Sequence, residues 1–560
     1  VILYFSKRRV YLNLESFSII FEVLMMNYLK CSSIIMVLLF VSLICVNSSF
    51  ASDSLYVESS NSDSNLTTYS CDSINTKSDL KNLNSLNTQD LDESFNEFDE
   101  YNKLVNKDIS IKTYGANSYN YSSNIDSVNA ISGNTFNDIQ NAINNAKNGD
   151  NIILNNIIYS GKGSFILVNK SVNIIGNGAI LNANGNSVIM KVNASKVNIT
   201  NMQFINGYSE KWVDAGALIL LENSNYCTIS NCVFKNNTAQ QGTVFVVSDY
   251  AKFLDCNFTN NIGISILNGT IYNKSARMSG GLNIDNNGSY GYVSGCIFKG
   301  NIGRAGGGAS LRGDYNTIEN CTFIQNSVNG GSYDRDYGGA LHVGPNNESL
   351  STASIFNCVF INNSVYSEEH KGHGGALCFA DGSVMENCTF INNYCEGIGG
   401  ATTLHGSGTL SNCIFINCTA TINGGAITTG YNELRKWTAN FVNCVFEGNA
   451  APVGGAVCAI GDGINFFNST FIRNIAVSGG AIYIEGDNSS FNNLSVINNS
   501  GDIGGAFYIE GNNANINNSL LDYNNANIGG AVNIIGDNSN LINLNISYNI
   551  AKYGGGVYVN

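Results

Sequence analysis

The stretch that decides the fold is SGGAIYIEGD, Ser478–Asp487, which returns 25 residues later as IGGAFYIEGN, Ile503–Asn512. Both copies combine two glycines, a small residue and a short apolar run. The second glycine of such pairs recurs in steps of 25 residues, once 30, at Gly375, Gly400, Gly425, Gly455, Gly480, Gly505, Gly530 and Gly555. A second signature, Phe-x-x-Asn, keeps the same period, as in Phe446 with Asn449 and Phe471 with Asn474. The repeat unit is therefore about 25 residues long.

A unit of this length cannot bury an apolar face alone, so each unit must stack on its neighbours, as solenoid repeats do. Each unit holds three short β-favouring runs separated by Gly, Asn and Asp. A leucine-rich repeat, the alternative of similar length, would need a Leu-rich consensus. The sequence therefore predicts an all-β fold, a single-stranded parallel β-helix solenoid, in which equal positions of successive coils form rows about 4.8 Å apart.

Three repeated positions have an expected structural role in such a column. The glycine pair is expected at a corner that needs positive φ or a close backbone approach. The Asn of Phe-x-x-Asn is expected to form a side-chain amide ladder or to cap the turn, with glycosylation as the alternative for exposed sites. Turns such as Gly486-Asp487 could attract calcium, although Gly-Asp is an ordinary turn former.

Eight cysteines stand two residues before the Phe position: Cys232, Cys256, Cys296, Cys321, Cys358, Cys388, Cys413 and Cys444. Ser469 and Leu494 fill this position in later units, so it takes a small or apolar side chain that points inward. Disulfides or metal ligation are the functional alternative. A disulfide needs a Cβ separation of about 3.8 Å, shorter than the coil spacing, so we expect a reduced structural ladder.

The chain before the repeats divides into two predicted parts. Residues 1–51 hold upstream residues and a signal peptide, with Met26 as a plausible start, an apolar run at 34–46 and cleavage after Ala51; a retained anchor is the alternative. Residues 52–132 are rich in Ser, Asn and Asp and predict a disordered leader. The β-helix is expected over 133–560, and it looks truncated because Asn560 falls inside a repeat.

A short helix is predicted at the start of the β-helix. Thr135 and Asp138 form a capping-box pattern, and Phe136, Ile139 and Ile143 fall on one helical face. We expect this N-terminal capping helix to cover the first coil, which would otherwise offer an unpaired edge.

Composition excludes one class of partner. The formal charge is −14 and the pI is about 4.7, so the chain lacks the basic stripe of nucleic-acid-binding proteins.

The motifs FKNN, FTNN, FINN and FIRN, paired with GGAL, GGAI and GGAV, resemble the repeats of chlamydial polymorphic outer-membrane proteins and, more closely, of adhesin-like proteins of methanogenic archaea from the gut. The segment IQNAINNAKNGDNIIL resembles the start of the pectin-lyase-like fold. The resemblance implies a right-handed β-helix and a secreted or cell-surface, adhesin-like protein that binds carbohydrate or a host or microbial cell-surface component. Contact with a membrane is expected only through the signal peptide or a missing C-terminal anchor.

Insertions in adjacent coils give one candidate ligand-binding patch, because a solenoid expels extra residues as loops. The two loops carry Asp334, Arg335, Asp336, Glu368, Glu369, His370 and His373. A further excursion, YNELRKWT, adds Tyr431 and Trp437 as an aromatic platform. All four histidines lie between His342 and His405.

The patch has two possible functions. Binding of a glycan or cation is the first, with no catalytic residue, no cofactor and only a weak indication of Ca²⁺. The alternative is a carbohydrate-active enzyme, a polysaccharide lyase or glycoside hydrolase, which needs two suitably spaced acids. The chain is predicted to be a binding protein rather than an enzyme.

Overall fold

The structure is a computed structural model that describes residues 2–5, 8–11, 128–211, 213–263, 266–267, 270–271, 279–330, 336–344, 352–367, 370–430 and 437–560. It divides into two units, Val1–Ile111 and Lys112–Asn560. In the first unit, β1 (Ile2–Phe5) pairs antiparallel with β2 (Arg8–Tyr11). The predicted signal peptide and residues 52–127 of the predicted leader lie outside the described residues.

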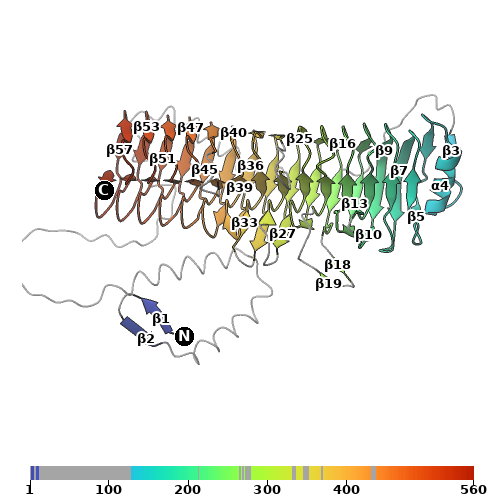
Figure 1. Cartoon of the computed structure of the whole chain (residues 1–560), viewed down its shortest axis with the longest axis horizontal. Helices are drawn as coiled ribbons and strands as arrows, with labels where there is room; N and C mark the ends of the chain where they lie inside the picture. Colours follow the sequence, from blue (N-terminus) through green and yellow to red (C-terminus); the bar gives the residue numbers. More distant parts are fainter. Residues whose placement is uncertain are drawn as a thin grey trace, which may run out of the picture. The chain divides into compact units, whose positions relative to one another are not determined.

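The second unit is a column of stacked coils in which strands pair in parallel with the coils before and after (Figure 1). One side is a fifteen-stranded sheet, the first sheet: β6 (Ile166–Val168), β8 (Met190–Val192), β11 (Leu218–Leu220), β15 (Val244–Val246), β20 (Leu282–Ile284), β24 (Ala309–Leu311), β29 (Leu341–Val343), β34 (Leu377–Phe379), β39 (Thr402–Leu404), β43 (Ile427–Thr429), β46 (Val457–Ala459), β49 (Ile482–Ile484), β52 (Phe507–Ile509), β55 (Val532–Ile534) and β58 (Val557–Val559).

Two further rows of strands complete each coil, and the long strands β7 and β9 belong to both. The second row is β3 (Val128–Ala130), β4 (Asn151–Ile153), β7 (Asn173–Asn182), β9 (Asn198–Ile205), β12 (Thr228–Ser230), β16 (Lys252–Leu254), β21 (Tyr292–Ser294), β25 (Asn316–Glu319), β30 (Ala353–Phe356), β35 (Val384–Glu386), β40 (Gly408–Ser411), β44 (Ala439–Val442), β47 (Asn465–Phe467), β50 (Ser490–Asn492), β53 (Asn515–Asn517) and β56 (Asn540–Ile542).

The third row shares β7 and β9 and otherwise holds β5 (Ile158–Ser160), β13 (Val233–Lys235), β17 (Asn257–Thr259), β22 (Ile297–Lys299), β26 (Thr322–Ile324), β31 (Val359–Ile361), β36 (Thr389–Ile391), β41 (Ile414–Ile416), β45 (Val445–Glu447), β48 (Thr470–Ile472), β51 (Ser495–Ile497), β54 (Leu520–Asp522) and β57 (Asn545–Ser547). This arrangement confirms the predicted all-β, right-handed parallel β-helix, the hand that parallel crossovers nearly always take.

Small sheets lie at the corners between these rows. They are β10 (Tyr208–Ser209) with β14 (Thr238–Ala239); β23 (Ile302–Gly303), β27 (Ser327–Gly330), β32 (Ser364–Ser367), β37 (Tyr394–Cys395) and β42 (Thr419–Ala420); β28 (Asp336–Tyr337), β33 (Gly372–His373) and β38 (Gly397–Ile398); and the antiparallel pair β18 (Ile266–Leu267) and β19 (Thr270–Ile271).

The predicted helix is α4 (Phe136–Asn145), which lies at the end of the column beside β3 (Figure 1). Its capping box is present, because the N–H of Asp138 donates to Thr135 Oγ1 at 3.3 Å and the N–H of Thr135 donates to Asp138 Oδ2 at 2.8 Å. Gln140 exchanges two side-chain hydrogen bonds, at 3.0 and 2.7 Å, with the backbone of Leu167 in β6. The helix therefore occupies the edge of the first sheet, as the sequence predicted.

The glycine pair meets both expected needs. Gly479 has a φ of +65°, a left-handed conformation that favours glycine. A Cβ on Gly480 would lie 2.2 Å from the carbonyl oxygen of Gly505, so the second glycine leaves room for the next coil. Ala481 follows, fully buried, and leads into β49.

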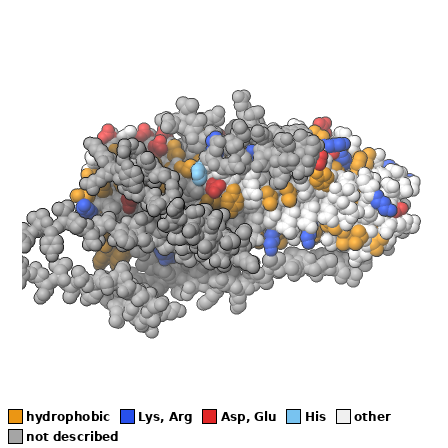
Figure 2. Space-filling model, turned by 90° about the horizontal axis from the view of Figure 1, so that it is seen from below, with side chains coloured by type: hydrophobic (Ala, Val, Ile, Leu, Met, Phe, Trp, Pro, Cys, Tyr) orange, Lys and Arg blue, Asp and Glu red, His pale blue; other side chains and the backbone are white. Residues whose placement is uncertain are grey.

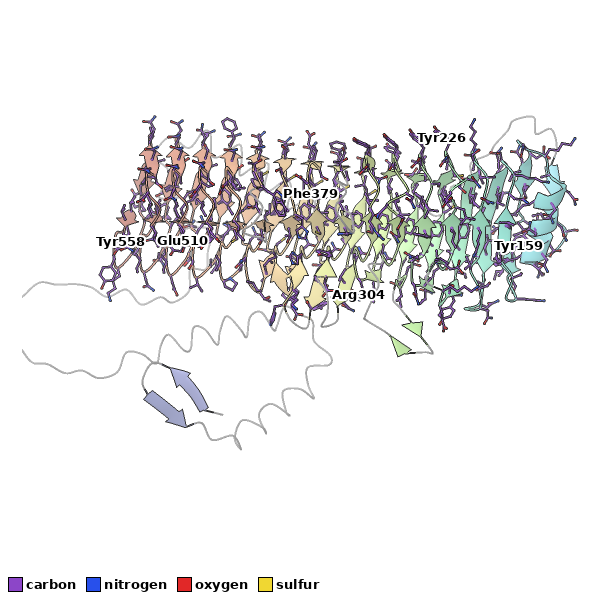
Figure 3. The ribbon with its side chains drawn as sticks, in the orientation of Figure 1. Tyr159, Tyr226, Arg304, Phe379, Glu510 and Tyr558 are labelled. Carbon is purple, nitrogen blue, oxygen red and sulfur yellow. The ribbon has the colours of Figure 1, made fainter. Side chains whose placement is uncertain are left out.

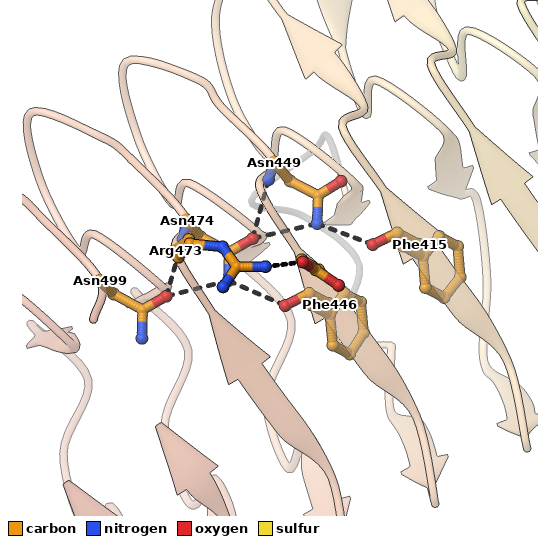
Figure 4. A network of polar contacts seen from close by, with 7 residues as sticks. Phe415, Phe446, Asn449, Arg473, Asn474 and Asn499 are labelled. Carbon is orange, nitrogen blue, oxygen red and sulfur yellow. Dashed lines mark hydrogen bonds and ion pairs between the residues drawn. The ribbon is translucent and has the colours of Figure 1, made fainter. Parts of the chain in front are cut away.

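Rows of like side chains fill the column. The rings of Phe415 and Phe446 stack with centroids 5.0 Å apart and planes within 5° of each other. Beside them, Asn449 Nδ2 donates to the carbonyl oxygen of Phe415 and to Oδ1 of Asn474, both at 3.0 Å (Figure 4). The predicted amide ladder is thus present, and it satisfies backbone groups at a corner where the strands end.

Candidate functional site

The two coils with insertions and the coil that follows them each contribute one short strand to a small parallel sheet, β28, β33 and β38, which we call the ledge. Asp336 pairs with Gly372 and Tyr337 pairs with His373, and His373 in turn pairs with Ile398. Tyr337, His373 and Ile398 share this register because each stands two residues before the second glycine of its coil. These three residues therefore align side by side.

Side chains from the ledge and from the first sheet meet in a group that we call the histidine cluster. It is formed by Tyr337, His342, His373, Cys378 and His405. The Tyr337 ring is its centre, with centroid distances of 5.3 Å to His342, 5.5 Å to His373 and 5.4 Å to His405. His342 lies in β29, Cys378 in β34, and His405 follows β39. Adjacent strands of the first sheet thus supply one wall of the cluster and the ledge supplies the other.

A chain of polar contacts links the cluster. His373 Nδ1 lies 2.9 Å from His405 Nε2, and His405 Nδ1 lies 3.6 Å from the Sγ of Cys378. The hydrogen bond between the imidazoles needs one donor and one acceptor, so at least one of the two rings is neutral when it forms. His373 and Cys378 contact opposite nitrogens of His405, so they do not converge on one point where a metal ion could sit.

Burial limits the chemistry of the cluster. Asp336 is 0% exposed, and His342 and His373 are 5% and 6% exposed. Burial also raises the pKa of the Cys378 thiol, so this sulfur is protonated and a poor nucleophile at neutral pH. Tyr337 and His405 are only half-buried. Figure 2 shows a histidine side chain reaching the surface close to an acidic side chain.

Residues 217–371 match the family model described as a right-handed beta helix region. The matched segment includes β28 of the ledge but ends before His373. A comparison with curated protein sequences found no match.

Several solved structures are similar to the chain. The tailspike protein of an Escherichia coli bacteriophage, in complex with a pentasaccharide, is 13% identical, with 76% of each chain covered and a TM-score of 0.36. An alginate lyase from a Paenibacillus species is 14% identical, with 56% of this chain and 94% of that chain covered and a TM-score of 0.32. A surface adhesin of Streptococcus pneumoniae, PfbA, is 12% identical, with 73% and 91% covered and a TM-score of 0.27. Likenesses this distant do not transfer a function.

The other predicted site residues lie in different places. Asp334, Arg335, Glu368, Glu369 and Tyr431 fall outside the described residues. His370 is exposed in a left-handed turn with a φ of 56°. Trp437 is half-buried just before β44, in the second row rather than at the ledge. The structure therefore brings together Asp336 and His373, and it leaves Trp437 apart from them.

The predicted site residues did not include Tyr337, His342, Cys378 or His405. A signal was available, because His342 and Cys378 both stand three residues after the second glycine of their coils. Equal offsets from that glycine place residues on adjacent strands, as the pairing of His342 with Cys378 shows.

The eight cysteines of the repeated position lie inside the column, each buried and free of disulfides. Each thiol donates back to the carbonyl group two residues earlier, as Cys232 does to Ser230 at 3.2 Å. Burial raises the pKa of Cys232 and Cys388. These thiols are therefore part of the packing, and the structure gives them no contact with solvent.

Acidic turns also form a row. Asp462 Oδ1 accepts the N–H of Asp487 at 3.0 Å, and Asp487 Oδ1 accepts the N–H of Asn512 at 2.7 Å. These carboxylates thus hold successive turns together. Over the described part of the chain, no group of three His, Cys, Asp or Glu residues is placed to hold a metal ion. Calcium binding stays a prediction.

An open cleft of about 420 Å³ lies among the first coils. It is lined by neutral groups, namely Asn184, Gly185, Asn206, Gly207, Tyr208, Asn236 and Thr238. Such a lining can form hydrogen bonds to a polar ligand, but it holds no acid for general acid–base chemistry. The one helix among the described residues, α4, is too short and too polar to cross a membrane.

Proposed function

We propose that this chain is a secreted or cell-surface, adhesin-like protein that binds carbohydrate at the ledge. The observation that carries the proposal is the alignment of β28 and β33 of the ledge beside the histidine cluster, in which the rings of Tyr337 and His405 are only half-buried. Tyrosine and histidine combine a flat apolar body with a polar tip, which suits a sugar ring and its hydroxyl groups. The predicted signal peptide supports secretion.

Binding is favoured over cleavage by the state of the acids at the ledge. Asp336 is fully buried within β28, so its carboxylate is not open to a substrate. Glycoside hydrolysis needs two carboxyl groups that flank the scissile bond. Among the described residues of the ledge, no such open pair is present. The enzymatic alternative therefore rests on Asp334 and Glu369, which a reducing-sugar assay of Asp334→Ala and Glu369→Ala would test.

The experiment is a glycan array probed with the full chain and two variants. Tyr337→Ala removes the central ring of the cluster, and we expect it to weaken binding of short oligosaccharides at least fivefold. Tyr366→Ala is the matched control, because this tyrosine is 48% exposed on the neighbouring strand β32. Unchanged denaturation midpoints would show that both variants fold.

Two results would contradict the proposal. One is no binding to any glycan by the wild-type chain. The other is equal loss of binding in both variants, or loss in Tyr366→Ala alone, which would place the site away from the histidine cluster.

A further inference from the structure

Four exposed tyrosines on consecutive coils form a row that we call the tyrosine stack: Tyr226, Tyr250, Tyr290 and Tyr315. Their ring centroids are 4.6, 4.9 and 5.3 Å apart in turn, with planes within 16° of each other. The four side chains are 53%, 36%, 46% and 62% exposed. Figure 3 shows Tyr226 at one edge of the column and Arg304 at the opposite edge. The stack is thus a surface feature and not part of the core.

The backbone at these positions does not favour tyrosine. All four residues are left-handed, with φ between 56° and 62°. The same turn in later coils holds Asn488, Asn513 and Asn538, with φ of 59°, 57° and 58°. The hydrogen bonds show this equivalence. The N–H of Tyr226, at 3.1 Å, and the N–H of Asn488, at 2.8 Å, each donate to a carbonyl group of the next coil, that of the residue just before the equivalent turn position.

Asparagine adopts positive φ several times more readily than a bulky residue, so tyrosine is the costlier choice for this turn. Four successive coils nevertheless have tyrosine at this turn. Residues held in a sparsely populated backbone conformation point to a role of the side chain beyond folding.

The geometry of the stack defines what it can recognise. Ring faces are covered by neighbouring rings, so the ring edges and the hydroxyl groups face outward. The strands that follow add a row of outward groups beside the stack: Thr228, Lys252, Tyr292 and Thr317. Next to these, the Tyr292 hydroxyl donates to Glu319. This surface is rich in hydroxyl groups, and its charged side chains include Lys252 and Glu319 beside the stack and Lys196 at the same turn in the coil before Tyr226.

We propose that the tyrosine stack binds an extended, uncharged polysaccharide that lies parallel to the column, with about one sugar unit for each coil spacing of about 4.8 Å. An anionic polymer is disfavoured, because Asp249 and Asp314 immediately precede two of the tyrosines and the chain carries a net charge of −14. The inference rests on the proposed carbohydrate-binding function for its ligand class, but its site is separate from the ledge.

The experiment measures binding of the full chain to a soluble neutral β-glucan and to a series of its oligosaccharides from two to eight units. The test variant replaces all four tyrosines of the stack by asparagine, the residue that the chain itself uses at this turn in later coils. We expect at least tenfold weaker binding of the polymer, and a denaturation midpoint equal to or above that of the wild type. In the wild type, affinity should rise up to about four units and then level off, because the stack spans four coils.

The control variant is Tyr523→Asn with Tyr548→Asn, which removes another exposed pair of rings stacked 4.8 Å apart. It should bind as the wild type does. Unchanged binding in the fourfold variant, equal loss in the control, or affinity that does not depend on chain length would overturn the inference. Loss of polymer binding in the fourfold variant, together with unchanged binding of this variant to the glycan array, would show that the tyrosine stack is a site separate from the ledge.

Discussion

Asn449 and Asn474 lie one coil apart and meet at a single oxygen: the backbone N–H and the side-chain Nδ2 of Asn449 both donate to Oδ1 of Asn474, at 2.9 and 3.0 Å. Asn474 repeats the arrangement with Asn499 in the next coil, at 2.9 Å for both bonds. Each asparagine thus serves as acceptor for the coil before it and as donor to the coil after it. The row of asparagines fixes the register of the coils. That register aligns the side chains that form rows on the surface.

Replacing Asn474 by alanine should destabilise the column strongly. The change removes the acceptor for Asn449 and the donor to the carbonyl oxygen of Phe446, which leaves several buried polar groups without partners. Each such group costs about 1–3 kcal/mol, so we expect a loss of about 3 kcal/mol or more. Chemical denaturation of the variant measures it. Asn465→Ser is the control, since serine occupies that exposed position in the next coil as Ser490, and a similar loss there would contradict the account.

Cys418 interrupts the amide ladder, and repairing the interruption should stabilise the chain. Asn393 Nδ2 donates to the carbonyl oxygen of Phe360 at 3.0 Å, but towards the next coil it meets the sulfur of Cys418, at 3.9 Å, in place of an amide oxygen. In Cys418→Asn the new side chain would accept from Asn393 and donate to the carbonyl oxygen of Phe390. We expect a gain of about 1 kcal/mol, read as a higher denaturation midpoint. A lower midpoint would show that packing around the thiol outweighs the hydrogen bonds.

The two kinds of glycine should respond differently to substitution. Gly480→Ala would place a Cβ against the carbonyl oxygen of Gly505, so the two coils must move apart, and we expect a large fall in the melting temperature. Gly463 has a φ of +63°, and a Cβ there would make one ordinary van der Waals contact, at 3.4 Å with Thr438 Cγ2, at a turn where the next coil has Asn488. Gly463→Asn should therefore leave the melting temperature within about 2 °C of the wild type. Equal effects would refute the distinction.

Alkaline pH should destabilise the fold through its buried thiols. Burial raises the pKa of Cys227 to about 11, and it also raises the pKa of Cys458. The folded state therefore keeps these protons more tightly than the unfolded chain, whose thiols titrate near the ordinary value of 9.0. Their contribution to stability is complete below that value and is lost as pH rises toward the folded pKa, by at most about 1.4 kcal/mol per pH unit for each thiol.

Denaturation midpoints measured from pH 7 to pH 11 test this dependence. The matched variant is Cys458→Thr, since Thr428 holds the paired position in the coil before it. The variant should lose stability less steeply above pH 9. An identical slope in both proteins would mean that this thiol does not contribute.

The fold could be predicted from the sequence because its repeat period is marked by residues with unusual backbone requirements. Gly479 and Gly480 mark a corner, and the Phe and Asn rows repeat with it.

The ledge was only partly predictable. The insertions around Asp336 and His373 were visible as extra length, but their pairing as strands depends on which residues share an offset from the glycine. A buried Asp336 was not foreseen, since charge in a long loop usually faces water.

The tyrosine stack was hidden for a different reason. The coil between Tyr250 and Tyr290 is much longer than the one before it, so the four tyrosines do not recur at one period in the sequence. Their common turn becomes apparent only from the backbone, where all share a left-handed conformation. A row on a solenoid can therefore be regular in space and irregular along the chain.

The most direct test of the whole account is to incubate the wild-type chain with a neutral polysaccharide and to measure, in the same sample, the bound fraction and the length distribution of the polymer. We expect saturable binding with no shortening of the polymer over time. Progressive shortening that depends on Asp334 or Glu369 would contradict it and would make the chain an enzyme.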